Sequence, residues 1–198
     1  VREAAHGAGA PVVFADYDLP PEPQYPVQIE QAYAATRHVA EHGRELGLDS
    51  SRIAVAGDSA GGNMATVVAL LAKERDGPPI AFQWLLYPVT DAGMDFPSYT
   101  QFETGYWLVS KAMVWFWDAY LPDAAARKHY PACPLNATLA QLRNLPPALI
   151  VTSENDVLRD EGEAYARKLW QASVPTASLR ANGTIHDFAL LNQLAETQ

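Results

Sequence analysis

Residues 57–61 read Gly-Asp-Ser-Ala-Gly, a pattern in which a serine lies between small residues in a tight turn. An apolar strand-like segment (53–57) precedes it, and an apolar helical segment (65–72) follows. A turn between a strand and a helix strains the serine backbone and directs its hydroxyl away from the sheet edge. Ser59 is therefore a candidate nucleophile, and the backbone N–H of Ala60 is a candidate donor to an oxyanion. The alternative is a passive serine in a glycine-rich turn.

A serine hydroxyl becomes nucleophilic when a base takes its proton and a carboxylate orients that base. On a scaffold of this kind the order along the chain is serine, acid, histidine. His129 and His186 are the histidines that follow Ser59. His129 falls in an aromatic segment above the predicted sheet, whereas His186 follows a predicted strand. His186 is the better candidate base, and its alternative is a surface histidine without a role.

The acid is expected in the loop after the strand predicted at 148–152. Glu154 and Asp156 both lie there, and Asp160 lies one turn into the next helix. Asp156 is favoured because it is further into the loop and can point back across the sheet edge. Asp160 has a simpler role near a helix start, where the dipole favours an acidic residue. The alternative for Asp156 is a helix cap or a loop carboxylate without a catalytic role.

The elements expected around these residues alternate between strands and helices. Strands are predicted at 12–17, 53–57, 80–87, 148–152 and 176–180, and helices at 25–46, from 60 onward, at 160–171 and from 187 to 194. Strands that are continuous apolar runs indicate an α/β fold, a mostly parallel sheet with helices on both faces. Residues 91–130 interrupt the alternation with helical pieces rich in aromatics. We expect this segment, called the insertion below, to form a lid or cap within a single domain spanning residues 1–198.

The composition argues against several kinds of partner and site, although the acidity can also serve simple solubility. The chain has 198 residues and a net charge of −9, which argues against nucleic acid or an anionic membrane as partner. A single cysteine, Cys133, leaves no intrachain disulfide and no cysteine cluster for a metal. That usage favours a reducing compartment such as the cytoplasm. The sequence contains no apolar run long enough to span a bilayer.

Several motifs together resemble the hormone-sensitive-lipase-like esterases of the α/β-hydrolase fold. The string Gly-Asp-Ser-Ala-Gly-Gly-Asn at 57–63 is similar to that family's nucleophile motif, and the segments 16–22, 85–88, 156–162 and 186–188 agree with it in order. The resemblance covers nearly the whole chain. It implies Ser59 as nucleophile, Asp156 as acid and His186 as base. It also implies hydrolysis of short- to medium-chain acyl esters, with no cofactor and no metal.

The sequence departs from the family pattern at its beginning. The family carries a His-Gly-Gly-Gly-type loop that donates to the oxyanion, followed by a helix. Residues 6–9 read His-Gly-Ala-Gly, but only Ala10 and Pro11 separate them from the predicted strand. We therefore interpret residues 1–5 as the end of a helix and 7–9 as its exit. The hypothesis that follows is a fragment, incomplete at the amino terminus and in its last helix, with weak turnover.

Two further readings stay open at this point. The same serine, histidine and aspartate could serve an acyltransferase or a peptidase, because acceptor choice depends on pocket shape. A non-catalytic hydrolase that keeps its fold is the alternative from a different class.

The predicted strand at 12–17 would offer an unpaired apolar edge, which predicts self-association into a homo-oligomer.

Overall fold

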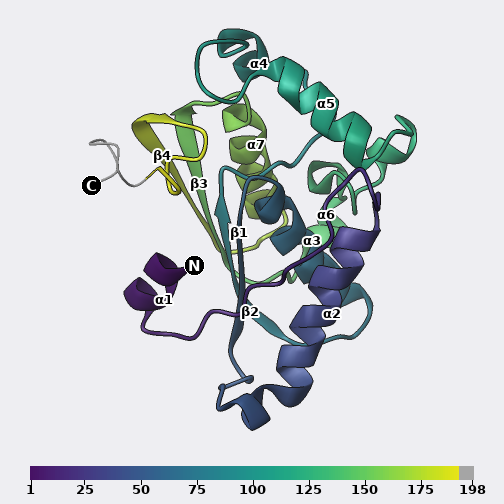
Figure 1. Cartoon of the computed structure of the whole chain (residues 1–198), viewed down its shortest axis with the longest axis vertical. Coiled ribbons are helices and arrows are strands. Elements are labelled where there is room, and N and C mark those ends of the chain that lie inside the picture. The colour runs from purple at the N-terminus through teal and green to yellow at the C-terminus, as the bar shows by residue number, and fades with distance from the viewer. Residues whose placement is uncertain (192–198) are drawn as a thin grey trace.

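The computed structural model describes residues 1–191 and contains one parallel four-stranded sheet (Figure 1). Its strands lie side by side in the order of the sequence, each paired in parallel with the next. The strands are β1 (Ile53–Asp58), β2 (Ile80–Leu86), β3 (Ala148–Asn155) and β4 (Thr176–Ile185). Parallel neighbours require a crossover connection between them, and helices supply these crossovers.

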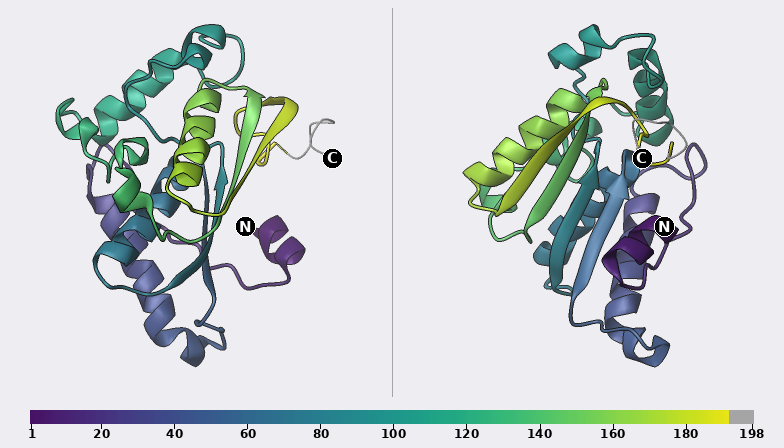
Figure 2. Two further views of the ribbon diagram at one scale, coloured as in Figure 1. Left: turned by 180° about the vertical axis from the view of Figure 1, so that it is seen from behind. Right: turned by 90° about the vertical axis from the view of Figure 1, so that its left-hand side faces the viewer.

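Most helices pack on one face of this sheet, whereas α1 lies on the opposite side (Figures 1 and 2). The α-helices are α1 (Arg2–Ala8), α2 (Val27–His42), α3 (Ala60–Glu74), α4 (Pro97–Gln101), α5 (Ser110–Tyr120), α6 (Leu139–Leu142) and α7 (Arg159–Gln171). Short 3-10 helices are η1 (Gly43–Leu46), η2 (Ala126–Lys128) and η3 (Pro134–Asn136). None of the described helices is both long and apolar enough to cross a membrane.

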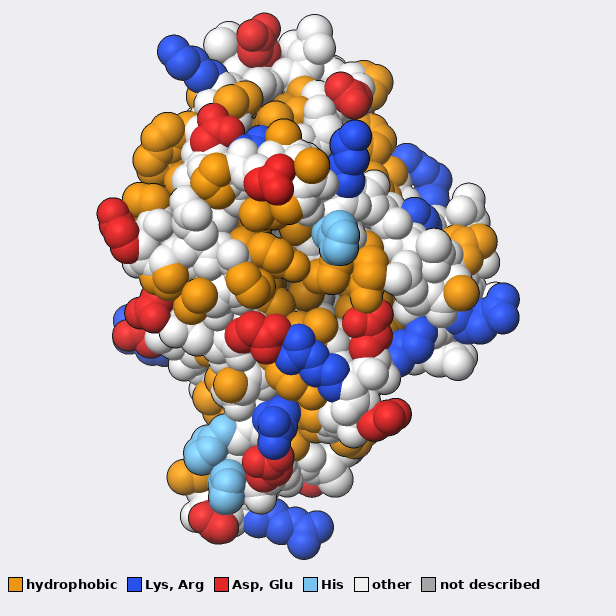
Figure 3. Space-filling model, turned by 90° about the vertical axis from the view of Figure 1, so that its right-hand side faces the viewer, with side chains coloured by type: hydrophobic (Ala, Val, Ile, Leu, Met, Phe, Trp, Pro, Cys, Tyr) orange, Lys and Arg blue, Asp and Glu red, His pale blue; other side chains and the backbone are white. Residues whose placement is uncertain are grey.

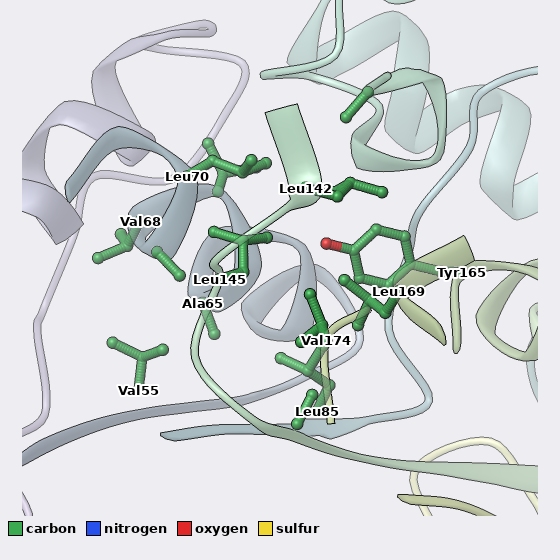
Figure 4. Packing of buried hydrophobic residues seen from close by; sticks show 14 of the residues in the cluster. Val55, Ala65, Val68, Leu70, Leu85, Leu142, Leu145, Tyr165, Leu169 and Val174 are labelled. Atoms are coloured by element: carbon green, nitrogen blue, oxygen red, sulfur yellow. The ribbon is translucent and has the colours of Figure 1, made fainter. Parts of the chain in front are cut away.

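The main core lies between the sheet and the helices α2, α3 and α7 (Figure 4). Helix α3 contributes a run of buried side chains from Ala65 to Ala72, which is why its sequence is apolar on all sides. Three buried polar groups in this core are paired with one another: the Thr66 hydroxyl donates to Gln83 Oε1 at 2.9 Å and lies 2.7 Å from the Tyr165 hydroxyl. These bonds satisfy groups that would otherwise be costly to bury.

The opposite face of the sheet is much more open. Side chains alternate along each strand, so Val55 and Leu85 face the helices while their neighbours face the other way. The strand register places a set of half-buried or exposed apolar side chains together on that other face: Ala54, Ala56, Phe82, Trp84, Leu149, Val151, Ala177 and Leu179. We call this set the open face.

The insertion leaves the sheet after β2 and returns before β3, above the carboxyl ends of the strands (Figure 1). It has its own apolar cluster, in which Phe102 and Trp117 pack with Val157 and Leu158 from the loop before α7. Other aromatics of the insertion, Tyr106, Trp107, Trp115 and Phe116, are largely exposed. On the face that bears α2, Figure 3 shows hydrophobic side chains gathered in a central hollow, with charged side chains around it.

The prediction of a strand at 12–17 is wrong. These residues have no regular structure, and Val12, Val13 and Phe14 are 42%, 55% and 67% exposed. An apolar run becomes a strand only where a neighbouring strand takes up its backbone hydrogen bonds. Within residues 1–191, β1 pairs with β2 and the segment 12–17 pairs with no strand.

Other boundaries shift by a few residues. The first helix runs to Ala8 rather than residue 5 and ends at Gly9, whose φ of 57° is left-handed. The helix predicted at 25–46 ends at His42 and continues as the 3-10 turn η1. The predicted closing helix begins only as turns at 187–190, and residues 192–198 lie outside the described part.

Candidate active site

The turn between β1 and α3 presents Ser59 at the carboxyl edge of the sheet. Ser59 has a φ of 53° and a ψ of −118°, a backbone conformation that residues other than glycine rarely adopt. Its backbone N–H donates to the Leu86 carbonyl at 2.9 Å, and its carbonyl accepts from the Val89 N–H at 3.1 Å. The strained turn is therefore held between β1 and the end of β2.

Close packing explains why small residues flank the serine. A Cβ on Gly57 would lie 2.1 Å from the Gly61 carbonyl oxygen, and one on Gly62 would lie 2.8 Å from the Cβ of Pro88. Helix α3 therefore starts directly against the strand end and against the loop after β2. The Ala60 N–H lies in the first turn of α3, where an N–H has no carbonyl one turn earlier to bond with. Such a group can donate to a developing negative charge.

Ser59, His186 and Asp156 form one hydrogen-bonded line. The Ser59 Oγ lies 3.0 Å from His186 Nε2, and His186 Nδ1 lies 2.7 Å from Asp156 Oδ2. The residues are 127 and 30 positions apart in the chain, so the fold alone brings them together. Asp156 Oδ1 also accepts the Leu158 N–H at 3.0 Å, which fixes the carboxylate. Asp156 is completely buried and His186 is 3% exposed.

The surroundings raise the pKa of His186. Burial alone lowers the pKa of this imidazole because it disfavours the charged form. The hydrogen bond that Nδ1 donates to Asp156, together with the negative charges of Asp156, Asp187 and Asp58, outweighs burial and raises the pKa. The ring can therefore accept a proton readily, which is what a general base requires.

The alternative acid and base candidates occupy other positions. Glu154 accepts the Gly183 N–H at 2.6 Å and so fastens the end of β4. Asp160 pairs with Arg159 at 2.8 Å and accepts the Ser98 N–H. His129 ends the turn η2, and in the described residues its imidazole makes no hydrogen bond to Ser59.

Sequence reasoning missed Asp187 and Tyr87, which both contact His186. Asp187 Oδ1 lies 3.4 Å from His186 Nε2, and its other oxygen accepts the Trp107 indole N–H at 2.9 Å. Tyr87 is fully buried, with its ring centroid 4.8 Å from that of His186 and 5.5 Å from that of Phe188. The place of Asp187 beside His186 in the sequence was a usable signal. The contact with Trp107 had none, because 80 positions separate the two residues.

Asn63 is a further positioning residue that the motif contained without a stated role. Its buried side-chain amide donates to the carbonyls of Val89 and Ala132, each at 3.0 Å. Val89 lies just before the insertion (91–130), and Ala132 lies just after it. Asn63 therefore ties the start of α3 to both ends of that segment.

The chain matches known proteins over almost its whole length. A family model described as alpha/beta hydrolase fold matches residues 1–190. Esterase LipI of Mycobacterium tuberculosis is 44% identical over 188 residues, which cover 94% of this chain and 58% of LipI. Carboxylesterase NlhH of the same species is 43% identical over 191 residues, covering 94% of this chain and 59% of NlhH.

Solved structures agree with this result. A thermostable esterase from Pseudomonas putida is 58% identical with a TM-score of 0.89, and the match covers 91% of this chain and 56% of that one. The chain thus spans less than two thirds of the length of these relatives. Fold, strand-to-helix serine turn and sequence identity agree, and the chain belongs to the alpha/beta hydrolase fold family.

Proposed function

We propose that this chain carries the reactive centre of a serine carboxylesterase that hydrolyses short- to medium-chain acyl esters. The observation that supports this most is the hydrogen-bonded line from Ser59 Oγ through His186 to Asp156. Its members lie at the carboxyl ends of the strands, which is the usual place for ligands in such sheets. The names of LipI and NlhH as esterases add support for the choice of ester over amide.

In the proposed reaction His186 Nε2 takes the Ser59 proton while Oγ forms a bond to the ester carbonyl carbon. The carbonyl electron pair moves to its oxygen, and the Ala60 N–H donates to that oxyanion. The bond to the alcohol oxygen then breaks, and His186 returns the proton to this leaving group. Water attacks the acyl-enzyme in the same way and regenerates the Ser59 hydroxyl. Asp156 keeps the Nδ1 proton in place and stabilises the imidazolium that forms in each half.

We also propose that the insertion acts as a cap within a single hydrolase domain. It lies above the sheet edge that bears Ser59, and its apolar cluster includes Val157, the residue after Asp156. Several of its aromatics pack inside that cluster and serve the cap's own core. Trp107, which is exposed and donates to Asp187 beside His186, is the aromatic that we place against an acyl or alcohol group.

A fluorophosphonate probe tests the assignment, since it bonds covalently to an activated serine. We expect labelling that disappears in Ser59→Ala and persists in Ser51→Ala, a control at an exposed serine. Hydrolysis of p-nitrophenyl esters should be fastest for short and medium acyl chains. A folded chain that takes no probe, or Ser59→Ala that still takes it, would contradict the proposal. Transfer of the acyl group to an added alcohol in preference to water would indicate an acyltransferase.

A further inference from the structure

The carboxylate of Asp187 lies between the proposed base and the insertion. Its Oδ1 is 3.4 Å from His186 Nε2, the same ring nitrogen that lies 3.0 Å from Ser59 Oγ. Its Oδ2 accepts the Trp107 indole N–H at 2.9 Å. One side chain therefore contacts both the atom that would exchange the serine proton and the loop above it.

The backbone on both sides of this contact is strained. Asp187 has a φ of 64° and Trp107 a φ of 74°, and the loop that leads to Trp107 turns at Gly105 with a φ of 89°. A bulky residue in this region is unfavourable and persists only where its surroundings hold it. Trp107 is 65% exposed, so burial does little to hold it. Its hydrogen bond to Asp187 is the polar contact that fixes the indole.

We propose that Asp187 is a positioning residue that couples the Trp107 loop to the proton transfer between Ser59 and His186. The inference rests on the proposed esterase function. The hydrogen bond from Trp107 holds the Asp187 carboxylate beside His186 Nε2 and prevents it from replacing Ser59 as the partner of that nitrogen. Asp187 in turn stabilises the charge that His186 acquires when it accepts the serine proton.

The chemistry follows from the two protonation states of the ring. In the resting state Nδ1 donates its proton to Asp156, and Nε2 offers a lone pair to the Ser59 hydroxyl. A nearby carboxylate repels that lone pair, and the Trp107 N–H offsets part of its charge. Once Nε2 carries the proton, the same carboxylate attracts it. If Trp107 released Asp187, the carboxylate could accept the Nε2 proton directly and compete with Ser59.

Other groups around His186 also act on the charge of its ring, and the contribution of Asp187 adds to theirs. Asp156 contacts Nδ1 from the loop after β3, and Asp58 acts through its charge from the end of β1. Tyr87 contacts the ring from the end of β2, and burial raises the pKa of its phenol well above the usual value, so it adds no charge. Asp187 is the carboxylate that approaches Nε2 among the described residues.

The test compares Asp187→Asn, Trp107→Phe and the double variant, with Trp115→Phe as control. Asparagine removes the charge but still accepts from the Trp107 indole, and phenylalanine keeps a ring but removes the N–H. Trp115 is 61% exposed on α5 and contacts Phe116, so it matches Trp107 in type and exposure. The His186 titration is followed by nuclear magnetic resonance of histidine-labelled protein, and kcat and KM are measured against pH.

We expect Asp187→Asn to lower the pKa of His186 and to reduce the plateau kcat by about three- to tenfold with little change in KM. Trp107→Phe should raise the pKa of His186 and raise KM, because the carboxylate is released and the loop is untethered. In the double variant the pKa of His186 should equal that of Asp187→Asn alone. Trp115→Phe should leave the titration and both kinetic constants as in the wild type.

Two results would overturn the inference. One is an unchanged pKa of His186 in Asp187→Asn. The other is a shift of this pKa by Trp107→Phe that is equally large in the wild type and in the Asp187→Asn background. A merely structural role would lower stability in these variants without moving the titration. Failure of the proposed function is recognised separately. If the chain takes no fluorophosphonate but the titration shifts as described, the coupling stands and the esterase assignment falls.

Discussion

Ser59 can occupy its strained conformation because the residues around it leave no room for another arrangement. Gly57 and Gly61 belong to the same motif, yet their surroundings differ. A Cβ on Gly57 would overlap the Gly61 backbone, whereas a Cβ on Gly61 would have Asp58 Oδ1 at 3.8 Å as its nearest neighbour. The first glycine is thus required by backbone packing, and the second is a helical residue with ordinary space around it.

The two glycines therefore predict opposite outcomes of the same substitution. Gly57→Ala should lower the free energy of unfolding by about 3 kcal/mol or more, because rigid backbone must move. Gly61→Ala should preserve it or raise it by about 0.5–1 kcal/mol, because alanine favours a helix over glycine. Urea denaturation of the two variants measures this difference. Equal losses in both would contradict the packing argument.

Glu161 on α7 joins three elements around the insertion. Its side chain is fully buried, and Oε1 accepts the N–H groups of Thr90 and Asp91 at 2.6 and 3.1 Å. Its Oε2 accepts the Tyr99 hydroxyl of α4 at 2.7 Å. Burial raises the pKa of Glu161 to about 8, although these three donors oppose the shift. The first residues of the insertion are therefore attached to the main fold through one carboxyl group.

This raised pKa predicts a pH-dependent stability. The folded-state pKa of Glu161 lies above its ordinary value of 4.5, so the folded chain binds the proton more tightly than the unfolded chain. The contribution is complete below pH 4.5 and is lost as the pH rises through about 8. Glu161→Gln cannot titrate, and its amide can still accept from the two backbone N–H groups.

We expect the stability of the wild type relative to Glu161→Gln to fall by about 2–4 kcal/mol between about pH 5 and about pH 9. Urea denaturation at both pH values gives the two differences. Glu41→Gln is the control, since Glu41 is exposed and its hydrogen bond to Arg37 lowers the pKa of Glu41. If the wild type and Glu161→Gln differed in free energy of unfolding by the same amount at both pH values, the claim that buried Glu161 binds a proton in the folded chain would be refuted.

The sequence predicted those elements whose apolar residues are buried by their own neighbours. Strands β1, β2 and β3 and helix α3 are continuous apolar segments between turn residues, and their positions were found within a few residues. Position along the chain also predicted that Ser59 and His186 would lie close together, because turn and strand ends determine which loops meet. The segment 12–17 is also apolar, but among residues 1–191 no strand pairs with it, so its composition alone predicted the wrong structure. The bonds of Glu161 and Trp107 join distant segments, and no local pattern encodes such contacts.

The molecule as a whole combines an acidic surface with the open face of the sheet. Parallel sheets are ordinarily covered on both faces, but on the side opposite α2, α3 and α7 the ribbon of residues 1–191 shows only the helix α1 (Figure 2). The strand side chains that face that side are half-buried or exposed apolar groups. Leu179 on β4 is 58% exposed, and the exposed Phe14 precedes β1 in the chain. Apolar surface of this kind favours association, whereas the net charge of −9 opposes it.

We therefore predict that the chain self-associates through the open face, more strongly as salt increases. Salt screens the repulsion between acidic chains but leaves apolar contact intact. Size-exclusion chromatography with light scattering should show a mass that rises with protein and salt concentration. Leu179→Lys should weaken association, whereas Leu46→Lys should not, because Leu46 is 61% exposed in η1, outside the open face. Both substitutions change the net charge equally, so a difference between them reports the surface rather than the charge. A monomer at every concentration, or equal weakening by both substitutions, would rule out the open face as the contact.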